Sequence, residues 1–258
     1  MGKNKLRKFR EMETLERVYQ YPYGLLRESG GCPMRGRWHS DCFGNTNPIT
    51  LELGCGKGEY TVGLAQRFPD RNFIGIDIKG ARMWSGACRM RDLGITNAAF
   101  LRTSIELLDS FFAPGEVDEI WITFPDPQMK KATKRLTGTR FLSLYSKVCR
   151  PGARINLKTD SPFLYTYTRA MLDHNAIKPL ADIDDLHNPA SQADETLTSI
   201  KTYYESQWID RGLTIKYLAW QLDPATHLSE PDIDIEFDTY RSFSRGQLQM
   251  PQLFDNEE

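Results

Sequence analysis

Residues 48–60 read Pro-Ile-Thr-Leu-Glu-Leu-Gly-Cys-Gly-Lys-Gly-Glu-Tyr, and this stretch decides the fold. A short apolar run ends in a turn that holds Gly54, Gly56 and Gly58, and a helical pattern follows from Glu59. Three glycines within five positions remove every Cβ that would obstruct a close approach to the backbone. The stretch therefore predicts a strand–turn–helix unit. The glycine turn either binds a ligand or only connects the strand to the helix.

A second apolar run, Asn72–Asp77, ends in a carboxylate. In a doubly wound α/β sheet, a carboxylate at the end of the second strand can accept hydrogen bonds from both hydroxyls of a ribose. Glu52 and Asp77 lie at matching ends of the two predicted strands. Two acids in these positions favour a turn that binds a ligand. The sequence therefore predicts a pocket for a cofactor that contains adenosine.

The glycine pattern also indicates which cofactor this pocket takes. The dinucleotide fingerprint G-x-G-x-x-G needs a small residue at its sixth position, where this chain has Glu59. A negative side chain there opposes a pyrophosphate but not a zwitterionic sulfonium ligand, whose ammonium group Glu52 can attract. The P-loop pattern fails because Lys57 lies inside the glycine cluster. The pattern therefore favours S-adenosyl-L-methionine over NAD.

Composition excludes several classes of protein. The 258 residues are 40% hydrophobic and 26% charged, which is ordinary for a soluble chain. We expect no secretory signal and no membrane contact, because no apolar run approaches the roughly 18 residues that span a bilayer. Five scattered cysteines are expected to be reduced thiols in the cytoplasm. Cys32, His39 and Cys42 lack a fourth ligand and standard spacing, so no metal is expected.

Apolar runs alternate with helical patterns from Pro48 onward, which predicts a parallel sheet. Strands are expected at 49–53, 72–77, 98–102, 118–124 and 153–158, and helices at 59–68, 80–93, 104–112, 139–149 and 161–174. A run at 178–183, a helical stretch at 198–211 and a long strand at 213–222 would complete a seven-stranded sheet with an antiparallel edge. Residues 184–197 are expected to form an exposed loop.

Charge is distributed unevenly along the chain. Residues 1–10 hold five Lys and Arg and no acid, whereas residues 223–258 hold nine acids against two arginines. We predict three parts: a basic N-terminal arm at 1–37 with a short helix near Glu11–Tyr19, a main domain at 38–222, and an acidic C-terminal extension at 223–258. A basic arm can neutralise a phosphate backbone or can simply be solvated.

Residues 124–127, which end the fourth predicted strand, read Phe-Pro-Asp-Pro. Two prolines stiffen the backbone around Asp126 at the carboxyl edge of the sheet, where open α/β folds bind ligands. Cations then follow at Lys130, Lys131, Lys134, Arg135 and Arg140. A charge run is most often a solvated loop, but its placement beside the cofactor pocket favours contact with phosphates.

Two further motifs lie later in the chain. The fifth predicted strand ends in Asp160, another carboxylate at the same edge. Thr202 and Glu205 lie three residues apart at the start of a helical stretch, so they share one helical face. From spacing alone this pair is best interpreted as a helix cap, because a capping box has the same S/T-x-x-E spacing.

Four motifs together resemble the tRNA (guanine-N7)-methyltransferase family of the bacterial TrmB type. They occur in the order Leu-Glu-Leu-Gly-Cys-Gly-Lys-Gly (51–58), Phe-Pro-Asp-Pro (124–127) with its basic loop, Lys-Thr-Asp (158–160) and Thr-Tyr-Tyr-Glu (202–205). The resemblance runs from about Trp38 to Leu222. The glycine motif is common to many methyltransferases, whereas the second and fourth motifs are diagnostic.

The resemblance implies a class I S-adenosylmethionine-dependent methyltransferase fold, Rossmann-like with a seven-stranded, mostly parallel sheet. It implies methyl transfer to N7 of a guanine in the variable region of tRNA, by a monomer or homodimer. The family's cofactor site corresponds to Glu52, Gly54, Gly56, Gly58, Asp77, Thr103 and Asp126. Asp126 is also the catalytic residue by this resemblance, and the substrate contacts correspond to Lys130, Asp160, Thr202 and Glu205.

The chain departs from the family's pattern at three places. Gln128 stands where the family usually has Trp, the basic loop is shorter and lacks a histidine, and Thr103 replaces an acid after the third predicted strand. Two other interpretations stay open on the residues alone. They are a small-molecule methyltransferase on the same fold and a non-catalytic RNA-binding module.

Overall fold

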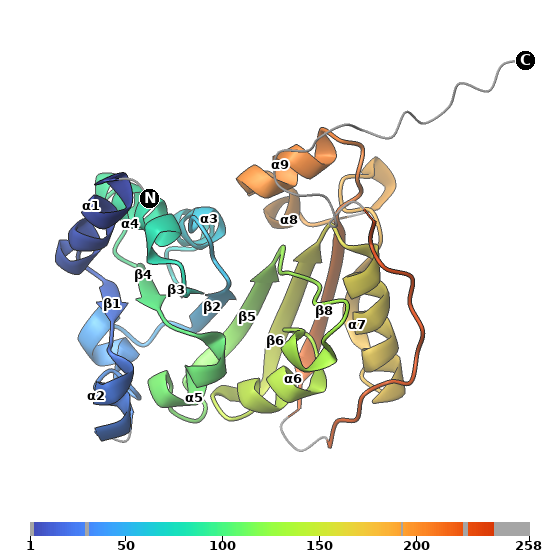
Figure 1. Cartoon of the computed structure of the whole chain (residues 1–258), viewed down its shortest axis with the longest axis horizontal. Helices are drawn as coiled ribbons and strands as arrows, with labels where there is room; N and C mark the ends of the chain where they lie inside the picture. The colour runs from blue at the N-terminus through green and yellow to red at the C-terminus, as the bar shows by residue number, and fades with distance from the viewer. Residues whose placement is uncertain (1–2, 29–30, 192, 224–226, 240–258) are drawn as a thin grey trace, which may run out of the picture.

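A computed structural model describes residues 3–28, 31–191, 193–223 and 227–239, and Figure 1 shows their arrangement around one sheet. The eight strands lie in the order β1-β4-β3-β2-β5-β6-β8-β7. Their bounds are β1 Val18–Gln20, β2 Ile49–Leu53, β3 Asn72–Asp77, β4 Ala98–Arg102, β5 Val117–Thr123, β6 Cys149–Thr159, β7 Pro179–Ile183 and β8 Lys216–Leu222.

Helices cover both faces of the sheet. The longer ones are α1 Lys3–Thr14, α3 Glu59–Arg67, α4 Gly80–Asp92, α6 Thr139–Tyr145, α7 Pro162–His174 and α9 Tyr203–Ile209. The short ones are α2 Tyr23–Glu28, α5 Leu108–Phe111 and α8 Glu195–Ser199, with single turns η1 Trp38–Phe43, η2 Ile105–Leu107, η3 Ala132–Lys134 and η4 Pro189–Ser191.

Each face of the sheet has its own apolar core, because alternate residues of a strand point to opposite faces. One core packs β-strand residues such as Ile74 and Ile120 against α5, α6 and α7. The other packs Phe73 and Phe100 against α1, α3 and α4. The chain is therefore a three-layer α/β sandwich, as the alternation of strands and helices predicted.

The five central strands were predicted within a few residues of their observed bounds. All five, β2 to β6, run parallel, so their carboxyl ends meet at one edge of the sheet. Strand β6 begins earlier than expected, at Cys149. Strand β8 is antiparallel and lies between β6 and β7, so the antiparallel strand is next to the edge instead of forming it.

The strand count is eight and not the expected seven, because the N-terminal region supplies β1. Residues 18–20 pair in parallel with β4. The helix expected near Glu11–Tyr19 is wrong in position: α1 begins at Lys3 and ends at Thr14. Contacts with α4 hold it, because Met12 is buried and the Trp84 indole N–H donates to Glu11 Oε2 at 2.6 Å.

The expected exposed loop at 184–197 is also wrong in part. Leu186 and Leu197 are buried, and the segment contains η4 and the start of α8. The helical stretch expected at 198–211 is divided, because Ile200 and the cap residue Thr202 separate α8 from α9. Ile200 lies against the face of α3 at Gly63, where a Cβ would be 2.8 Å from Ile200 Cγ2. The segment therefore packs on α3.

A close crossing at Gly58 fixes the turn between β2 and α3. Gly58 has a φ of +70°, and a Cβ there would lie 2.5 Å from the ring of Phe100, which is fully buried. Gly86 of α4 packs against the same turn, since its own added Cβ would lie 2.6 Å from the backbone oxygen of Lys57. Glycine at 58 is therefore required both by backbone conformation and by space.

We predict that Gly58→Ala lowers the free energy of unfolding by about 3 kcal/mol. Strain at positive φ accounts for about 1 kcal/mol and displacement of Phe100 for the rest. The matched control is Gly115→Ala, at φ +77° with nothing within 4 Å of the added Cβ. It should cost only the strain. Urea unfolding of both variants measures the difference, and equal losses would contradict the crossing.

Candidate functional site

The glycine turn has an open outer side. Gly54 and Gly56 have φ values of +78° and +56°. A Cβ added at Gly54 would meet nothing within 4 Å, and one at Gly56 would meet only the oxygen of Gly54 at 3.9 Å. Unlike Gly58, these two positions therefore leave room beside the backbone. The turn can take a ligand against its main chain, as the sequence predicted.

Glu52 lies beneath this turn and is buried. Its Oε2 accepts hydrogen bonds from the Thr61 N–H at 2.8 Å and from the Thr61 hydroxyl, and its Oε1 accepts from the Thr123 hydroxyl at 2.7 Å. The carboxyl thus joins β2 to α3 and β5. Burial raises the pKa of Glu52 to about 7, against the lowering effect of the threonine donors.

Asp77 ends β3 beside the turn. Its Oδ2 accepts from the Gly56 N–H at 2.9 Å, and its Oδ1 accepts from the Lys79 N–H at 2.7 Å. Thr103, at the end of β4, donates its backbone N–H to the Asp77 carbonyl oxygen at 3.2 Å. The structure therefore brings the glycine turn, Asp77 and Thr103 into direct contact at one edge of the sheet.

Asp126 lies at the same edge on a constrained backbone. The residues on either side of Pro-Asp-Pro, Phe124 and Gln128, have φ values of +49° and +48°. Positive φ values are uncommon for residues other than glycine. The Asp126 side chain is exposed, and its Oδ1 accepts from the Gln128 N–H at 2.9 Å. Sparsely populated backbone conformations of this kind cluster at functional sites.

The basic loop after Asp126 contains two kinds of cation. Arg135 supports the loop: its guanidinium lies 4.3 Å from the Tyr167 ring centre and donates to the Met129 carbonyl oxygen at 2.9 Å. Lys134 forms an ion pair with Glu106 at 2.7 Å. Within the described residues, the exposed side chains of Lys130 and Lys131 make no hydrogen bond or ion pair. These two are the cations free to bind a phosphate.

Glu205 forms a buried ion pair. Its Oε1 lies 2.8 Å from Lys158 Nζ, and both side chains are fully buried. His187 Nε2 lies 2.9 Å from the same oxygen. The other oxygen, Oε2, is buried and has no hydrogen-bond partner among the described residues. Thr202 caps α9, because its hydroxyl oxygen accepts from the Glu205 N–H at 3.1 Å, so the cap predicted from spacing is present.

The late helix also touches the glycine turn. The Tyr203 N–H donates to Glu59 Oε2 at 3.0 Å, and Lys57 Nζ lies 4.1 Å from the Tyr203 ring centre. Asp160 is buried at the end of β6, two residues after Lys158. Every predicted site residue thus lies at or beside the carboxyl edge of the sheet. Among the hydrogen bonds and ion pairs of the described residues, none joins Lys130 or Asp126 to another predicted site residue.

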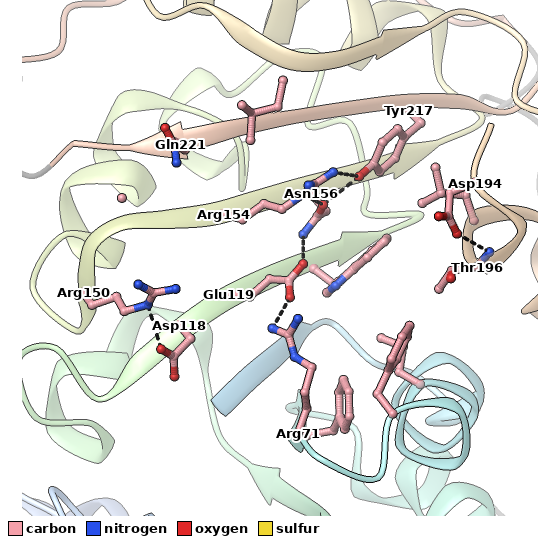
Figure 2. Close-up of a pocket in the computed structure, with 17 residues that line it drawn as sticks. Arg71, Asp118, Glu119, Arg150, Arg154, Asn156, Asp194, Thr196, Tyr217 and Gln221 are labelled. Carbon is pink, nitrogen blue, oxygen red and sulfur yellow. Dashed lines mark hydrogen bonds and ion pairs between the residues drawn. The ribbon is translucent and has the colours of Figure 1, made fainter. Parts of the chain in front are cut away.

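A cavity of about 460 Å³ lies elsewhere, on the face of β5, β6 and β8, and none of the predicted site residues lines it (Figure 2). Several of its polar side chains are hydrogen-bonded to one another. Asn156 donates to Glu119 Oε1 at 2.8 Å and accepts from the Tyr217 hydroxyl at 2.7 Å, and Arg71 pairs with Glu119. Glu119, Asn156 and Tyr217 form a satisfied network that links three strands.

Two absences concern the described residues only. No group of three or more His, Cys, Asp or Glu side chains in that part of the chain could hold a metal ion, and His39 Nε2 instead lies 3.0 Å from the Asn47 carbonyl oxygen. Across the same residues, no helix combines the length and the apolar character that crossing a membrane requires.

Comparison with known proteins identifies the family. The model of the family described as "Putative methyltransferase" matches residues 46–218. A tRNA (guanine-N(7)-)-methyltransferase of Porphyromonas gingivalis is 61% identical over 91% of this chain and 97% of its own length. A second, from Bacteroides thetaiotaomicron, is 53% identical over 95% and 96%. The chain belongs to the tRNA (guanine-N7)-methyltransferase family.

The fold agrees with this assignment. The crystal structure of the 16S rRNA methyltransferase KamB superposes with a TM-score of 0.56 at 15% identity, over 81% of this chain and 97% of that one. At this identity the likeness shows the class I methyltransferase fold alone. As a methyltransferase of this family, the chain uses S-adenosyl-L-methionine as its cofactor. The open side of the glycine turn has room for a ligand of that kind.

Sequence reasoning did not assign roles to two side chains of this site. Lys158 belongs to the Lys-Thr-Asp motif, and a lysine among apolar strand residues signals a buried partner. His187 lay in the segment expected to be an exposed loop. Nothing in the local sequence connects it with Glu205, which is eighteen residues away.

The pKa of Glu52 predicts a pH dependence of stability. The folded chain holds the Glu52 proton up to about pH 7, whereas the unfolded chain releases it near 4.5. The folded state binds more protons in between, so the contribution of Glu52 to stability falls as pH rises from about 4.5 to 7. Relative to Glu52→Gln, the wild type should lose about 3 kcal/mol across this range. Parallel curves of unfolding free energy against pH for the two proteins would contradict the buried, protonated carboxyl.

Proposed function

We propose that the protein transfers the methyl group of S-adenosyl-L-methionine to N7 of a guanine in the variable region of tRNA, in the cytoplasm, as a monomer or homodimer. The observation that carries the proposal is the 61% identity with a tRNA (guanine-N(7)-)-methyltransferase over nearly the whole of both chains. The arrangement of acids at the carboxyl edge supports it. An NAD-dependent enzyme, the other candidate for the glycine turn, does not agree with this family.

The cofactor half of the site is built from β2, β3 and β4. Gly54, Gly56 and Gly58 form the turn that accepts the cofactor against the main chain. Asp77 keeps one lone pair on each oxygen beyond its two backbone bonds, and these can accept from the ribose hydroxyls. Thr103 lies next to Asp77, where it can contact the adenine of the cofactor. Glu52 attracts the ammonium group of the methionine part, because a cation nearby stabilises the ionised form of the Glu52 carboxyl.

The chemistry needs alignment and electrostatics more than proton transfer. Guanine N7 carries a free lone pair, so it attacks the sulfonium methyl without a general base. Positive charge leaves sulfur and develops on the purine, and a carboxylate held nearby stabilises that change. Asp126 fills this role, because its constrained backbone fixes an exposed carboxylate at the edge of the sheet.

Selection of guanine falls to the acids of the substrate half, Asp160 and Glu205. Guanine presents N–H donors where adenine presents an acceptor, so carboxylates favour guanine. Glu205 Oε2 is a buried acceptor without a partner in the described structure, which a guanine N–H would satisfy. Because this oxygen is buried, the groups that cover it must move before the base reaches it. Thr202 caps α9 and so helps to hold Glu205 in place. Lys130 binds phosphate beside the base.

Asp126→Asn should lower the turnover number for methyl transfer to tRNA at least about 100-fold, because it removes the charge that faces the purine. The variant keeps the volume and the acceptor for the Gln128 N–H, so the fold should be unchanged. The measurement is the initial rate of transfer of a labelled methyl group from S-adenosyl-L-methionine to unmodified tRNA.

The control for this variant is Asp70→Asn, which changes an exposed aspartate at the C-terminal end of α3. It should transfer methyl groups at the wild-type rate. A folded Asp126→Asn protein that works within a few-fold of the wild type would rule out the assigned role.

Neutralising Lys130 and Lys131 distinguishes a tRNA substrate, which they would bind through phosphates, from a small uncharged substrate, which they would not. Lys130→Gln with Lys131→Gln should weaken tRNA binding and make the dependence of log affinity on log salt less steep by about 1.5, for two lost phosphate contacts. Lys178→Gln, before the amino end of β7 at the opposite edge, is the control. Filter binding across a salt series measures the slopes, and an unchanged slope would favour a small-molecule substrate.

A further inference from the structure

The described part of the acidic extension, residues 227–239, lies along the outer side of α7, and we call it the C-terminal strap. Figure 1 shows it in red beside α7. Its first anchor is at the C-terminal end of that helix, where the Ser229 N–H donates to Asn175 Oδ1 at 2.8 Å. Leu228 and Ile235 pack against the apolar core. The strap is therefore part of the folded structure.

A second anchor lies midway along α7. Glu230 Oε1 accepts from the Thr139 N–H at 3.0 Å and from the Thr139 hydroxyl at 2.6 Å, and its Oε2 accepts from the Tyr167 hydroxyl at 2.6 Å. Tyr167 is the ring on which Arg135 stacks. Through Tyr167, the strap supports the base of the loop that carries Lys130.

The third anchor, Asp238, lies at the N-terminal end of α7 and is 6% exposed. Its carboxylate accepts from the Ser161 hydroxyl and from the Phe163 N–H, the latter at 3.0 Å. Its own N–H lies 3.1 Å from Met129 Sδ. Asp238 thus contacts both the turn that follows Asp160 and the residue that precedes Lys130.

The charge of Asp238 suits this position. The first turn of a helix has free N–H groups and a positive end of the helix dipole, and α7 runs from Pro162 to His174. Burial lowers the pKa of Lys216, and the charges of Asp160 and Asp238 are among those that oppose this shift. The bonds from Ser161 and Phe163 end on different oxygens of the carboxylate. In asparagine one of these oxygens is replaced by an NH2 donor, so one of the two acceptor positions is lost.

We propose that Asp238 is a positioning residue for methyl transfer, which holds the turn carrying Asp160 and the loop carrying Lys130 in fixed register. The inference rests on the proposed function, because it assigns those two residues to the RNA substrate. Within the described residues, the hydrogen bonds of Asp238 go to Ser161, Phe163 and Met129 and not to the cofactor half of the site on β2, β3 and β4. Loss of Asp238 therefore weakens binding of tRNA and leaves binding of S-adenosyl-L-methionine unchanged.

The test compares Asp238→Asn with Asp234→Asn, a matched control on the same strap whose side chain is exposed. Asp238→Asn should raise KM for tRNA about tenfold, by loss of a charge-assisted bond, with kcat and the Kd for S-adenosyl-L-methionine within about twofold of the wild type. Asp234→Asn should leave all three at wild-type values. Hydrogen exchange should become faster at residues 159–164 and 128–131 and stay unchanged at the glycine turn.

Two results would overturn the inference. One is a KM for tRNA and an exchange pattern in Asp238→Asn that match those of Asp234→Asn. The other is a uniform loss, in which thermal stability, cofactor affinity and exchange protection at the glycine turn all fall together, since that is the behaviour of a general structural residue. A wild-type protein that leaves tRNA unlabelled would contradict the proposed function itself, so the two failures are distinguishable.

Discussion

The buried carboxyl of Glu52 is the constraint on which the rest of the site depends. It binds Thr61 at the start of α3 and Thr123 at the end of β5, so one side chain fixes the glycine turn relative to the strand that leads to Asp126. A buried carboxyl is costly unless its hydrogen bonds are made, and here both oxygens have donors. The glycine turn and Asp126, the aspartate that we propose to be catalytic, are therefore built on one shared support.

The proposed substrate half depends on a second buried group, the ion pair between Lys158 and Glu205. It ties α9 to the end of β6. Pairs of this kind contribute little net stability compared with apolar residues, but removing one partner leaves a buried charge that is strongly unfavourable. We therefore interpret the pair as a device that fixes the position of Glu205 near the cofactor edge.

The central strands and their carboxyl edge could be predicted, because short apolar runs that end in Gly54, Asp77 and Asp160 are local signals. The N-terminal strand β1 could not be predicted in the same way. Three half-buried residues, Val18–Gln20, gain their conformation from the edge of β4, which is distant in the sequence. The roles of His187 and Asp238 were hidden for the same reason, since each depends on a partner that only the folded chain brings near.

The most direct test of the account is the identity and position of the methylated base. The purified protein is incubated with methyl-labelled S-adenosyl-L-methionine and tRNA that lacks modifications, and the digested RNA is mapped by mass spectrometry. The account predicts labelled 7-methylguanine at a single guanine of the variable region. Label in another base, or tRNA that stays unlabelled while the folded protein binds the cofactor, would contradict it.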